Sequence, residues 1–375
     1  MITGLVIKGY RCFEKFEISG LGRVTLLVGK NNSGKTCLLE AAELVASSGD
    51  DEYDMSRLWR PLSRRGEVFP ESENGPKSGV EFELCHLFHG HQIKLGSALE
   101  VTAQRTDGRR SVKCEIVREE TGAAPTTSSR KLDNGSESRL AAAAFVLRMT
   151  SKSPSGGGTI SCQLTARGGL SSSSSIGYMG SVEDRERAQV VIITSTSLSI
   201  VEMQQYWSDV ALNPEEELAT HAVQILDPAI ERIASVSSPG YRFLARGGMV
   251  LKRKLPEQRI PIGSMGEGIW RMLAIALSLV RARNGMLLVD DIDTGLHHTV
   301  MSDMWRMVFE TARQLNVQVI ATTQSSDCVR GLAEVCGQGG SGQVSLQRIE
   351  PGSAHAVSYT EKQIGVAAER NVEVR

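Results

Sequence analysis

The N-terminal part of the chain combines strand and helix patterns. Residues 2–28 alternate apolar and polar positions and end in the continuous apolar run Val24–Val28, which predicts two strands, the second of them buried. Residues 35–48 place apolar side chains at helical spacing. They therefore predict a helix that begins directly after a glycine-rich turn.

The C-terminal part has a related pattern. From residue 263 onward, a helix, the apolar run Met286–Val289, a helix over 299–316 and the apolar run Val317–Thr323 follow one another, and residues 189–194 add another strand candidate. Short apolar strands that alternate with helices indicate a parallel sheet.

The middle of the chain differs from both ends. Residues 79–118 alternate and contain the turn Thr106–Gly108, which predicts an antiparallel meander. Apolar runs near 141–149 and 159–165 predict further strands, and residues 50–78 predict a loop with a short helix.

Four shorter segments give more local predictions. The runs Gly156–Gly158 and Ser171–Ser175 predict flexible loops. Residues 200–235 predict helices, and Tyr241–Arg253 predicts a hairpin that turns at Gly247–Gly248.

These patterns predict an α/β fold with three parts. Residues 1–48 and 189–375 are expected to be the two halves of one core with a mixed sheet, and residues 49–188 an inserted region that is β-rich and flexible.

Composition narrows the class of protein. The chain has 375 residues, 41% of them hydrophobic, and a net charge of −1, which gives no global attraction to nucleic acid or membrane. No apolar run is long enough to span a bilayer, and charged residues interrupt the N-terminus early, so we expect no membrane association. The seven cysteines are scattered and form no Cys-x-x-Cys pair, which argues against a disulfide framework or a zinc site and favours a cytoplasmic protein.

The strongest chemical signal is the segment Gly29–Thr36, which matches Gly-x-x-x-x-Gly-Lys-[Ser/Thr] between a predicted strand and helix. Backbone N–H groups of such a loop point at phosphates, Lys35 reaches the β- and γ-phosphates, and the Thr36 hydroxyl ligates Mg²⁺. A glycine-rich turn that matches by chance is disfavoured by its flanking elements. The predicted nucleotide-binding residues of the loop are Gly29, Asn31, Asn32, Ser33, Gly34, Lys35 and Thr36.

A second signal is the apolar run Met286–Val289, which ends in two carboxylates. Asp290 can hold Mg²⁺ through water, and Asp291 can polarise an attacking water molecule. The alternative is a strand that ends in a solvated acidic turn, and the upstream phosphate loop favours the functional interpretation.

Two weaker signals complete the set. The turn Ser264–Gly268 opens an apolar helix and can bind an anion, or it can be a plain helix cap. One nucleotide does not need two such turns in one chain, so two copies facing head to tail would use both. The strand Val317–Thr323 is followed by Gln324, which can sense a γ-phosphate; a helix cap at Ser325 or Ser326 is the alternative.

Along the chain the order is phosphate loop, Ser264–Gly268 turn, acidic strand end and the strand before Gln324. This order resembles the ABC ATPases, and more narrowly the RecF, SMC and OLD-family branch of AAA-type ATPases, over about residues 1–48 and 189–334. The resemblance implies an ABC-ATPase-like head, ATP and Mg²⁺ as ligands, and an ATP-dependent dimer. In that dimer Ser264, Gly266 and Gly268 contact the partner's ATP, and Asp293–Leu296 crosses the interface. The resemblance also places Arg11 near the nucleotide base.

Two positions depart from the family pattern. Asp291 stands where members usually carry Glu, and Gln324 stands where they usually carry His. Asp is one methylene shorter than Glu, and Gln cannot take up charge, so we expect slow hydrolysis with intact ATP binding. The predicted catalytic residues are Lys35, Asp291 and Gln324.

The function expected from these residues is an ATPase that dimerises around ATP and gates a separate effector protein. About fifty residues follow Gln324, too few for the nuclease domain of OLD-type members. A role in phage defence rests on the resemblance alone. Two alternatives stay open, namely a non-hydrolysing ATP sensor or scaffold and a RecF-like DNA-repair ATPase.

Two groups of side chains invite other interpretations. A basic run around Trp59 is a candidate for nucleic-acid contact, although such a run is more often a solvated face; it consists of Arg57, Arg60, Arg64 and Arg65. His86, His89 and His91 are predicted as strand and turn histidines rather than as metal ligands.

Overall fold

The computed structural model describes residues 1–46, 56–69, 80–118, 145–171, 190–236, 248–254, 258–337 and 343–369. The chain divides into two compact units. The first contains Met1, Ile18–Leu39 and Arg187–Arg375, and the second contains Ile2–Glu17 and Glu40–Glu186.

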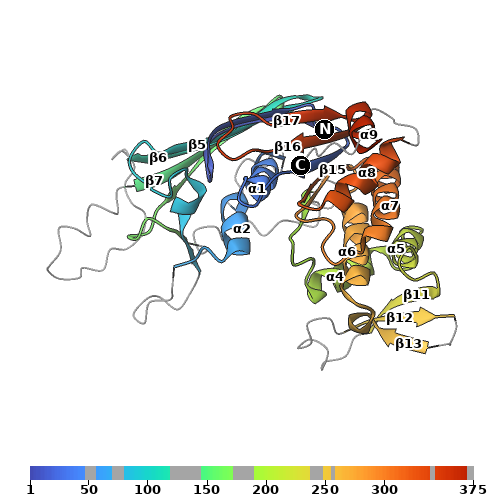
Figure 1. The fold of residues 1–375 in the computed structure, drawn as a ribbon. Helices are drawn as coiled ribbons and strands as arrows, with labels where there is room; N and C mark the ends of the chain where they lie inside the picture. The colour runs from blue at the N-terminus through green and yellow to red at the C-terminus, as the bar shows by residue number, and fades with distance from the viewer. Residues whose placement is uncertain are drawn as a thin grey trace. The chain divides into compact units, whose positions relative to one another are not determined.

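The first unit is built on a six-stranded sheet in the order β10-β14-β15-β3-β16-β17, of which Figure 1 labels β15, β16 and β17. Neighbouring strands from β10 through β14, β15 and β3 to β16 pair in parallel, and β17 pairs antiparallel to β16. The predicted α/β fold with a mixed sheet is confirmed. The strands are β3 Val24–Val28, β10 Val190–Ile193, β14 Met286–Val289, β15 Gln318–Thr323, β16 Val344–Arg348 and β17 Val357–Thr360.

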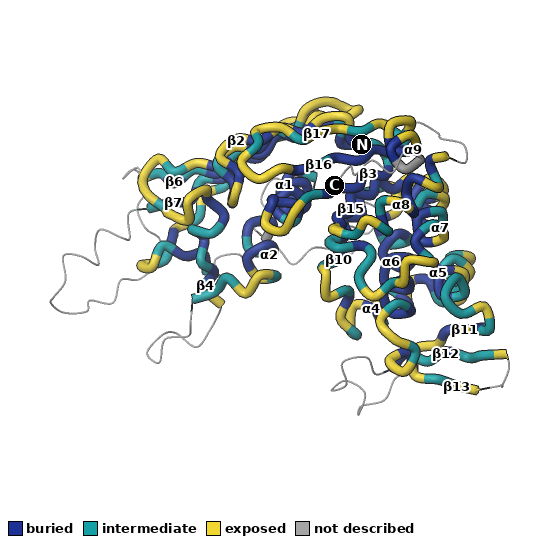
Figure 2. Tube along the Cα trace, viewed as in Figure 1, coloured by how far each residue is buried: buried dark blue, intermediate teal, exposed yellow. Residues whose placement is uncertain are grey.

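Strands β3, β14 and β15 are buried along their whole length, and Figure 2 shows β3 and β15 among the buried parts of the tube. Burial on both faces explains why their sequences are mostly apolar rather than alternating. The register pairs Val28 with Thr323, and Val289 with Ala321. Because the strands are parallel, the residues that follow β3, β14 and β15 meet at one edge of the sheet.

Helices pack beside this sheet and supply most of the core. Helix α6 carries an unbroken buried stretch, Ile269–Leu279, and packs against α4, α5 and α7, while α7 packs against α8 (Figure 1). The helices are α1 Lys35–Ala46, α4 Ile200–Val210, α5 Glu215–Gln224, α6 Glu267–Arg281, α7 Met301–Gln314, α8 Ser326–Gly337 and α9 Glu361–Glu369, with the short 3₁₀ helices η5 Ile262–Met265 and η6 His298–Val300.

A small three-stranded sheet corrects two sequence predictions. Its strands are β11 Ile230–Ser235, β12 Met249–Arg253 and β13 Gln258–Pro261. Residues 230–235, predicted as helical, form a strand because they pair with β12. The hairpin predicted over Tyr241–Arg253 is replaced by pairing of β12 with β11 and β13, and residues 237–247 lie outside the described residues.

The second unit is built on a sheet in the order β2-β1-β5-β6-β7-β8. The predicted meander is confirmed where β5 and β6 pair antiparallel on either side of the turn at Thr106–Asp107. Its strands and helices are β1 Ile2–Tyr10, β2 Phe13–Ser19, α2 Ser56–Arg65, β4 Glu81–Phe82, η1 Leu84–Leu87, β5 Ala98–Arg105, β6 Gly108–Arg118, β7 Phe145–Ser153, β8 Gly156–Gln163 and β9 Leu170–Ser171.

Two local predictions for this unit are wrong. Gly156–Gly158, predicted as a loop, begins β8 because it pairs with Ser151–Ser153 of β7. Residues Leu84–Leu87, predicted within the alternating meander, form the 3₁₀ helix η1, which buries Leu84 and Leu87 together. Ser172–Ser175 lie outside the described residues. In the described part of the chain no helix is both long enough and apolar enough to cross a membrane.

Candidate functional site

The turn between β3 and α1 folds around its own lysine. The Lys35 ammonium donates hydrogen bonds to the carbonyl oxygens of Gly29, at 2.7 Å, and Lys30, at 2.9 Å. Gly29 has a φ of +149°, and a Cβ there would lie 2.4 Å from the Ile349 carbonyl oxygen. Only glycine therefore fits at this position, and the loop adopts the conformation that its sequence predicts.

The loop contains a polar atom that needs a partner. The Ser33 hydroxyl is buried, and it has no hydrogen-bond partner among the described residues. A buried hydroxyl without a partner costs about 1–3 kcal/mol. Asn31 and Asn32 are exposed beside it. Burial lowers the pKa of Lys35, although the negative charges of Asp291 and Asp290 act to raise it. These residues fit an anion such as a nucleotide phosphate.

Hydrogen bonds join the ends of β3, β14 and β15. The Thr36 hydroxyl donates to Asp290 Oδ2 at 2.9 Å, and the Thr322 hydroxyl donates to Asp290 Oδ1 at 2.6 Å. The Asp291 N–H donates to the Thr322 hydroxyl at 2.8 Å. The predicted magnesium ligands Thr36 and Asp290 thus lie in contact, and their oxygen atoms are the type that Mg²⁺ prefers.

Asp291 takes an unusual backbone conformation. Its φ is +47°, in the left-handed region that non-glycine residues rarely adopt and that Asp and Asn tolerate best. Burial raises the pKa of Asp291, and the charges of Asp290 and Asp293 act in the same direction, while Lys35 and Arg271 oppose them. A raised pKa is typical of a carboxylate that accepts a proton during catalysis.

The sequence did not point to Arg271, a residue of α6. Its side chain supports the backbone of the segment that carries Asp290 and Asp291. Its side chain is 1% exposed. It donates hydrogen bonds to backbone carbonyl oxygens of Thr194 at 2.8 Å, Asp290 at 2.6 Å and Asp291 at 2.8 Å. Burial lowers the pKa of Arg271 to about 10, against the nearby carboxylates, the first of which is Asp291. Arg271 therefore ties α6 to the ends of β10 and β14.

The turn at the start of α6 is open to solvent. Ser264 and Gly266 are exposed, and a Cβ at Gly266 would meet nothing within 4 Å. A Cβ at Gly268, in contrast, would lie 2.9 Å from the Gly295 carbonyl oxygen. Gly268 therefore permits close packing of the Ser264–Gly268 turn on the Asp293–Leu296 segment, so the two segments predicted to face a partner lie together.

Two other predicted residues have different surroundings. Gln324 is exposed directly after β15. Arg11 belongs to the second unit, where its guanidinium is 3% exposed and pairs with Glu40 at 2.5 Å and with Glu67 at 2.9 Å. A contact of Arg11 with a nucleotide base stays a prediction.

The basic run on α2 is largely engaged within the second unit. Arg57 is buried, Arg64 pairs with Glu43, and Arg65 pairs with Glu40 at 2.8 Å. These contacts give the run a structural role, and its contact with nucleic acid stays a prediction.

Two family models match parts of this chain. Residues 1–101 match the family described as "AAA ATPase domain". Residues 178–327 match the family described as "AAA domain, putative AbiEii toxin, Type IV TA system". A curated relative from Helicobacter pylori, named "ATP/GTP phosphatase", is 20% identical over 349 residues, which cover 89% of this chain and 88% of the relative.

Solved structures of SMC heads are also similar. The SMC head domain from Thermotoga maritima is 12% identical, with a TM-score of 0.43 and coverage of 96% of this chain and 98% of that one. An Smc head domain derived from Pyrococcus furiosus, bound to the C-terminal domain of ScpA, is 12% identical, with a TM-score of 0.45 and 99% of each chain covered. The two family matches support a resemblance to AAA-type ATPases, as the sequence predicts.

Proposed function

We propose that this chain, as an ATPase of the AAA, SMC and RecF-like class, binds ATP with Mg²⁺, closes head to tail with a second copy and hydrolyses the nucleotide slowly. The main support for this proposal is the set of hydrogen bonds among Thr36, Asp290, Asp291 and Thr322. It joins the phosphate loop to the two acidic residues at the edge of the sheet.

Each residue has a role that its position supports. Lys35 would leave the carbonyl oxygens of Gly29 and Lys30 to bind phosphate oxygens, and the Ser33 hydroxyl would gain a partner. Thr36 and Asp290 would hold Mg²⁺, which neutralises phosphate charge when bound. Asp291 would orient the attacking water and accept its proton, with Gln324 donating a hydrogen bond nearby.

The head-to-tail arrangement follows from the open turn at α6. The N-terminus of a helix favours an anion through the helix dipole, and Ser264 and Gly266 present this turn to solvent. A second copy would bring its bound nucleotide to this turn. The closed dimer would then gate a separate effector protein. Phage defence is one biological setting for such a role.

Ser264→Arg tests the arrangement. We expect it to leave ATP binding by the monomer nearly unchanged and to weaken ATP-dependent association by at least about 30-fold, since disrupting a central interface residue costs roughly 2 kcal/mol or more. Light scattering with a slowly hydrolysed ATP analogue measures the association. Ser208→Arg, on the exposed face of α4, is the matched control. If Ser264→Arg associates as the control does, the head-to-tail proposal is wrong.

Arg271→Lys tests the support beneath Asp291. Lysine cannot reproduce the planar fork that reaches four carbonyl oxygens, including that of Ile292, so the acidic segment should lose its position. We expect ATP turnover to fall at least tenfold while ATP affinity changes less than about threefold. The control is Arg281→Lys on the same helix, where the arginine pairs with Asp209 near the surface. Turnover and affinity falling in proportion would indicate a general structural role instead.

Phosphate release separates the proposed function from its alternatives. A slow rate that is unchanged by duplex DNA supports a dimer that gates a protein effector. Release that DNA strongly stimulates would favour a DNA-repair ATPase, and no release above background would favour a non-hydrolysing sensor.

A further inference from the structure

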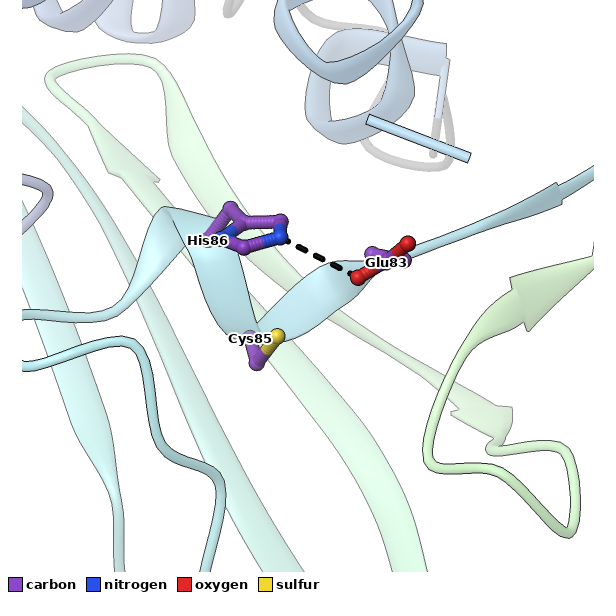
Figure 3. Close-up of side chains that lie close together, drawn as sticks. All are labelled: Glu83, Cys85 and His86. Atoms are coloured by element: carbon purple, nitrogen blue, oxygen red, sulfur yellow. Dashed lines mark hydrogen bonds and ion pairs between the residues drawn. The ribbon is translucent and has the colours of Figure 1, made fainter. Parts of the chain in front are cut away.

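A cluster of metal-ligand side chains lies in the second unit, apart from the residues assigned above. Glu83, Cys85 and His86 each offer one ligand atom, and these atoms all lie within 4.8 Å of one another. Glu83 Oε2 is 3.1 Å from His86 Nε2. Figure 3 shows the carboxylate and the imidazole facing each other, with the Cys85 side chain on the same short helix.

The local fold explains why the three side chains meet. In a 3₁₀ helix, residues three apart lie one above the other, and Glu83 is the residue before η1 while His86 lies in its last turn. The helix is held in place by Leu84 and Leu87, which are buried, and by a 2.9 Å hydrogen bond from the Arg11 N–H to the Leu87 carbonyl oxygen. The side chains are therefore arranged before any ion binds.

His91 adds a second observation. His91 Nδ1 lies 3.2 Å from His86 Nδ1, and the backbone reaches this position through positive φ values at Gly90, +80°, and His91, +55°. A histidine that binds a metal through one nitrogen typically donates its other N–H to a nearby acceptor, which fixes the ring. If His86 Nε2 binds the ion, His86 Nδ1–H can donate to His91 Nδ1.

We propose that Glu83, Cys85 and His86 form a binding site for Zn²⁺, with His91 orienting His86 and a water molecule in the fourth position. Thiolate, imidazole and carboxylate together are the ligand set of zinc rather than of magnesium. Ligand atoms around tetrahedral zinc are about 3.3–3.6 Å apart, so a small inward movement completes the site. The exposed fractions of His86, 32%, and Glu83, 27%, leave a path for the ion.

A zinc site at Glu83, Cys85 and His86 differs from the expectation, based on the scattered cysteines, that the chain has none. That expectation relied on the absence of a Cys-x-x-Cys pair. The site uses one cysteine, and its other ligands come from the same turn, Glu83 two residues before Cys85 and His86 one residue after it.

Cobalt and zinc binding to the full chain, stripped of metal and free of nucleotide, tests the proposal. We expect one Co²⁺ per chain, with the absorption bands of tetrahedral and thiolate-bound cobalt, and loss of those bands when Zn²⁺ is added. Cys85→Ser should remove the thiolate band, and Glu83→Gln and His86→Gln should each weaken Zn²⁺ binding at least tenfold in competition with a chromophoric chelator. His91→Gln should weaken it about 10–100-fold, as expected for an orienting partner.

Two controls separate this site from other surface groups. Cys12→Ser removes an exposed thiol of the same unit, and His89→Gln removes a histidine whose Nδ1 contacts the Arg11 carbonyl oxygen at 3.0 Å. Both should bind Co²⁺ and Zn²⁺ as the wild type does. Far-UV circular dichroism checks that each variant is folded. No thiolate band in the wild type, or a band that persists in folded Cys85→Ser, would overturn the proposal.

Discussion

Lys35→Ala is expected to weaken ATP binding by at least about 100-fold. The Lys35 ammonium is the buried cation of the phosphate loop, and each charged hydrogen bond that it makes to a phosphate is worth about 1.5–3 kcal/mol. Equilibrium binding of a fluorescent ATP analogue in the presence of Mg²⁺ measures the loss.

Lys30→Ala is the matched control for that experiment. Lys30 lies in the same loop, is exposed, and contributes only its backbone carbonyl oxygen to the Lys35 contact. We expect its ATP affinity to stay within a few-fold of the wild type. Unchanged affinity in Lys35→Ala would remove the assignment of this loop to the nucleotide.

Asp291→Asn is expected to lower the hydrolysis rate by about 10²–10⁴-fold, the usual contribution of a general base, while ATP stays bound. The backbone conformation at position 291 should tolerate this substitution without distortion. Asn tolerates the left-handed conformation at φ +47° as well as Asp does, so the fold of the segment should survive the loss of the charge. Phosphate release gives the rate, and the fluorescent analogue gives the affinity. Unchanged turnover would show that another group activates the water.

The slow turnover expected of the wild type has its own test. If the short Asp291 side chain and the neutral Gln324 limit the rate, Asp291→Glu combined with Gln324→His should raise it at least several-fold. Glu fits the left-handed backbone less well, so the thermal stability of this variant should be measured beside its rate. A wild type that already turns over faster than the double variant would show that the site is built around the shorter acid.

The sequence predicts the arrangement of residues at the ends of β3, β14 and β15 well because its signals are strong and local. The apolar runs of β3, β14 and β15 have few alternatives to buried parallel strands. The residues that follow such strands must meet, as Thr36 and Asp290 do at 2.9 Å.

The wrong predictions share a physical cause, which is that tertiary pairing outweighs local propensity. Gly156–Gly158 looks like a loop, yet Gly157 is needed where the β7–β8 hairpin brings the Ser151 carbonyl oxygen within 2.6 Å of a Cβ position. Ile230–Ser235 continues a helical pattern, but it forms a strand because β12 provides its partner.

Arg271 shows what the sequence could have indicated and what it could not. A charged residue inside the apolar run Ile269–Leu279 must find partners if the helix is buried, and that signal was available. The identity of those partners was not, because Thr194 lies 77 residues away along the chain. The Glu83–His86 cluster was hidden for a similar reason, since its geometry depends on a 3₁₀ turn in a segment with a strand-like pattern.

The most direct test of the proposed function is the molar mass of Asp291→Asn in solution with Mg²⁺ and ATP, compared with ADP. Because this variant should bind ATP without hydrolysing it, the closed state should accumulate. We predict that the mass doubles with ATP, stays that of a single chain with ADP, and does not increase when Ser264→Arg is added to the variant. A mass that is the same with ATP and ADP, at nucleotide concentrations that saturate the site, would contradict the account.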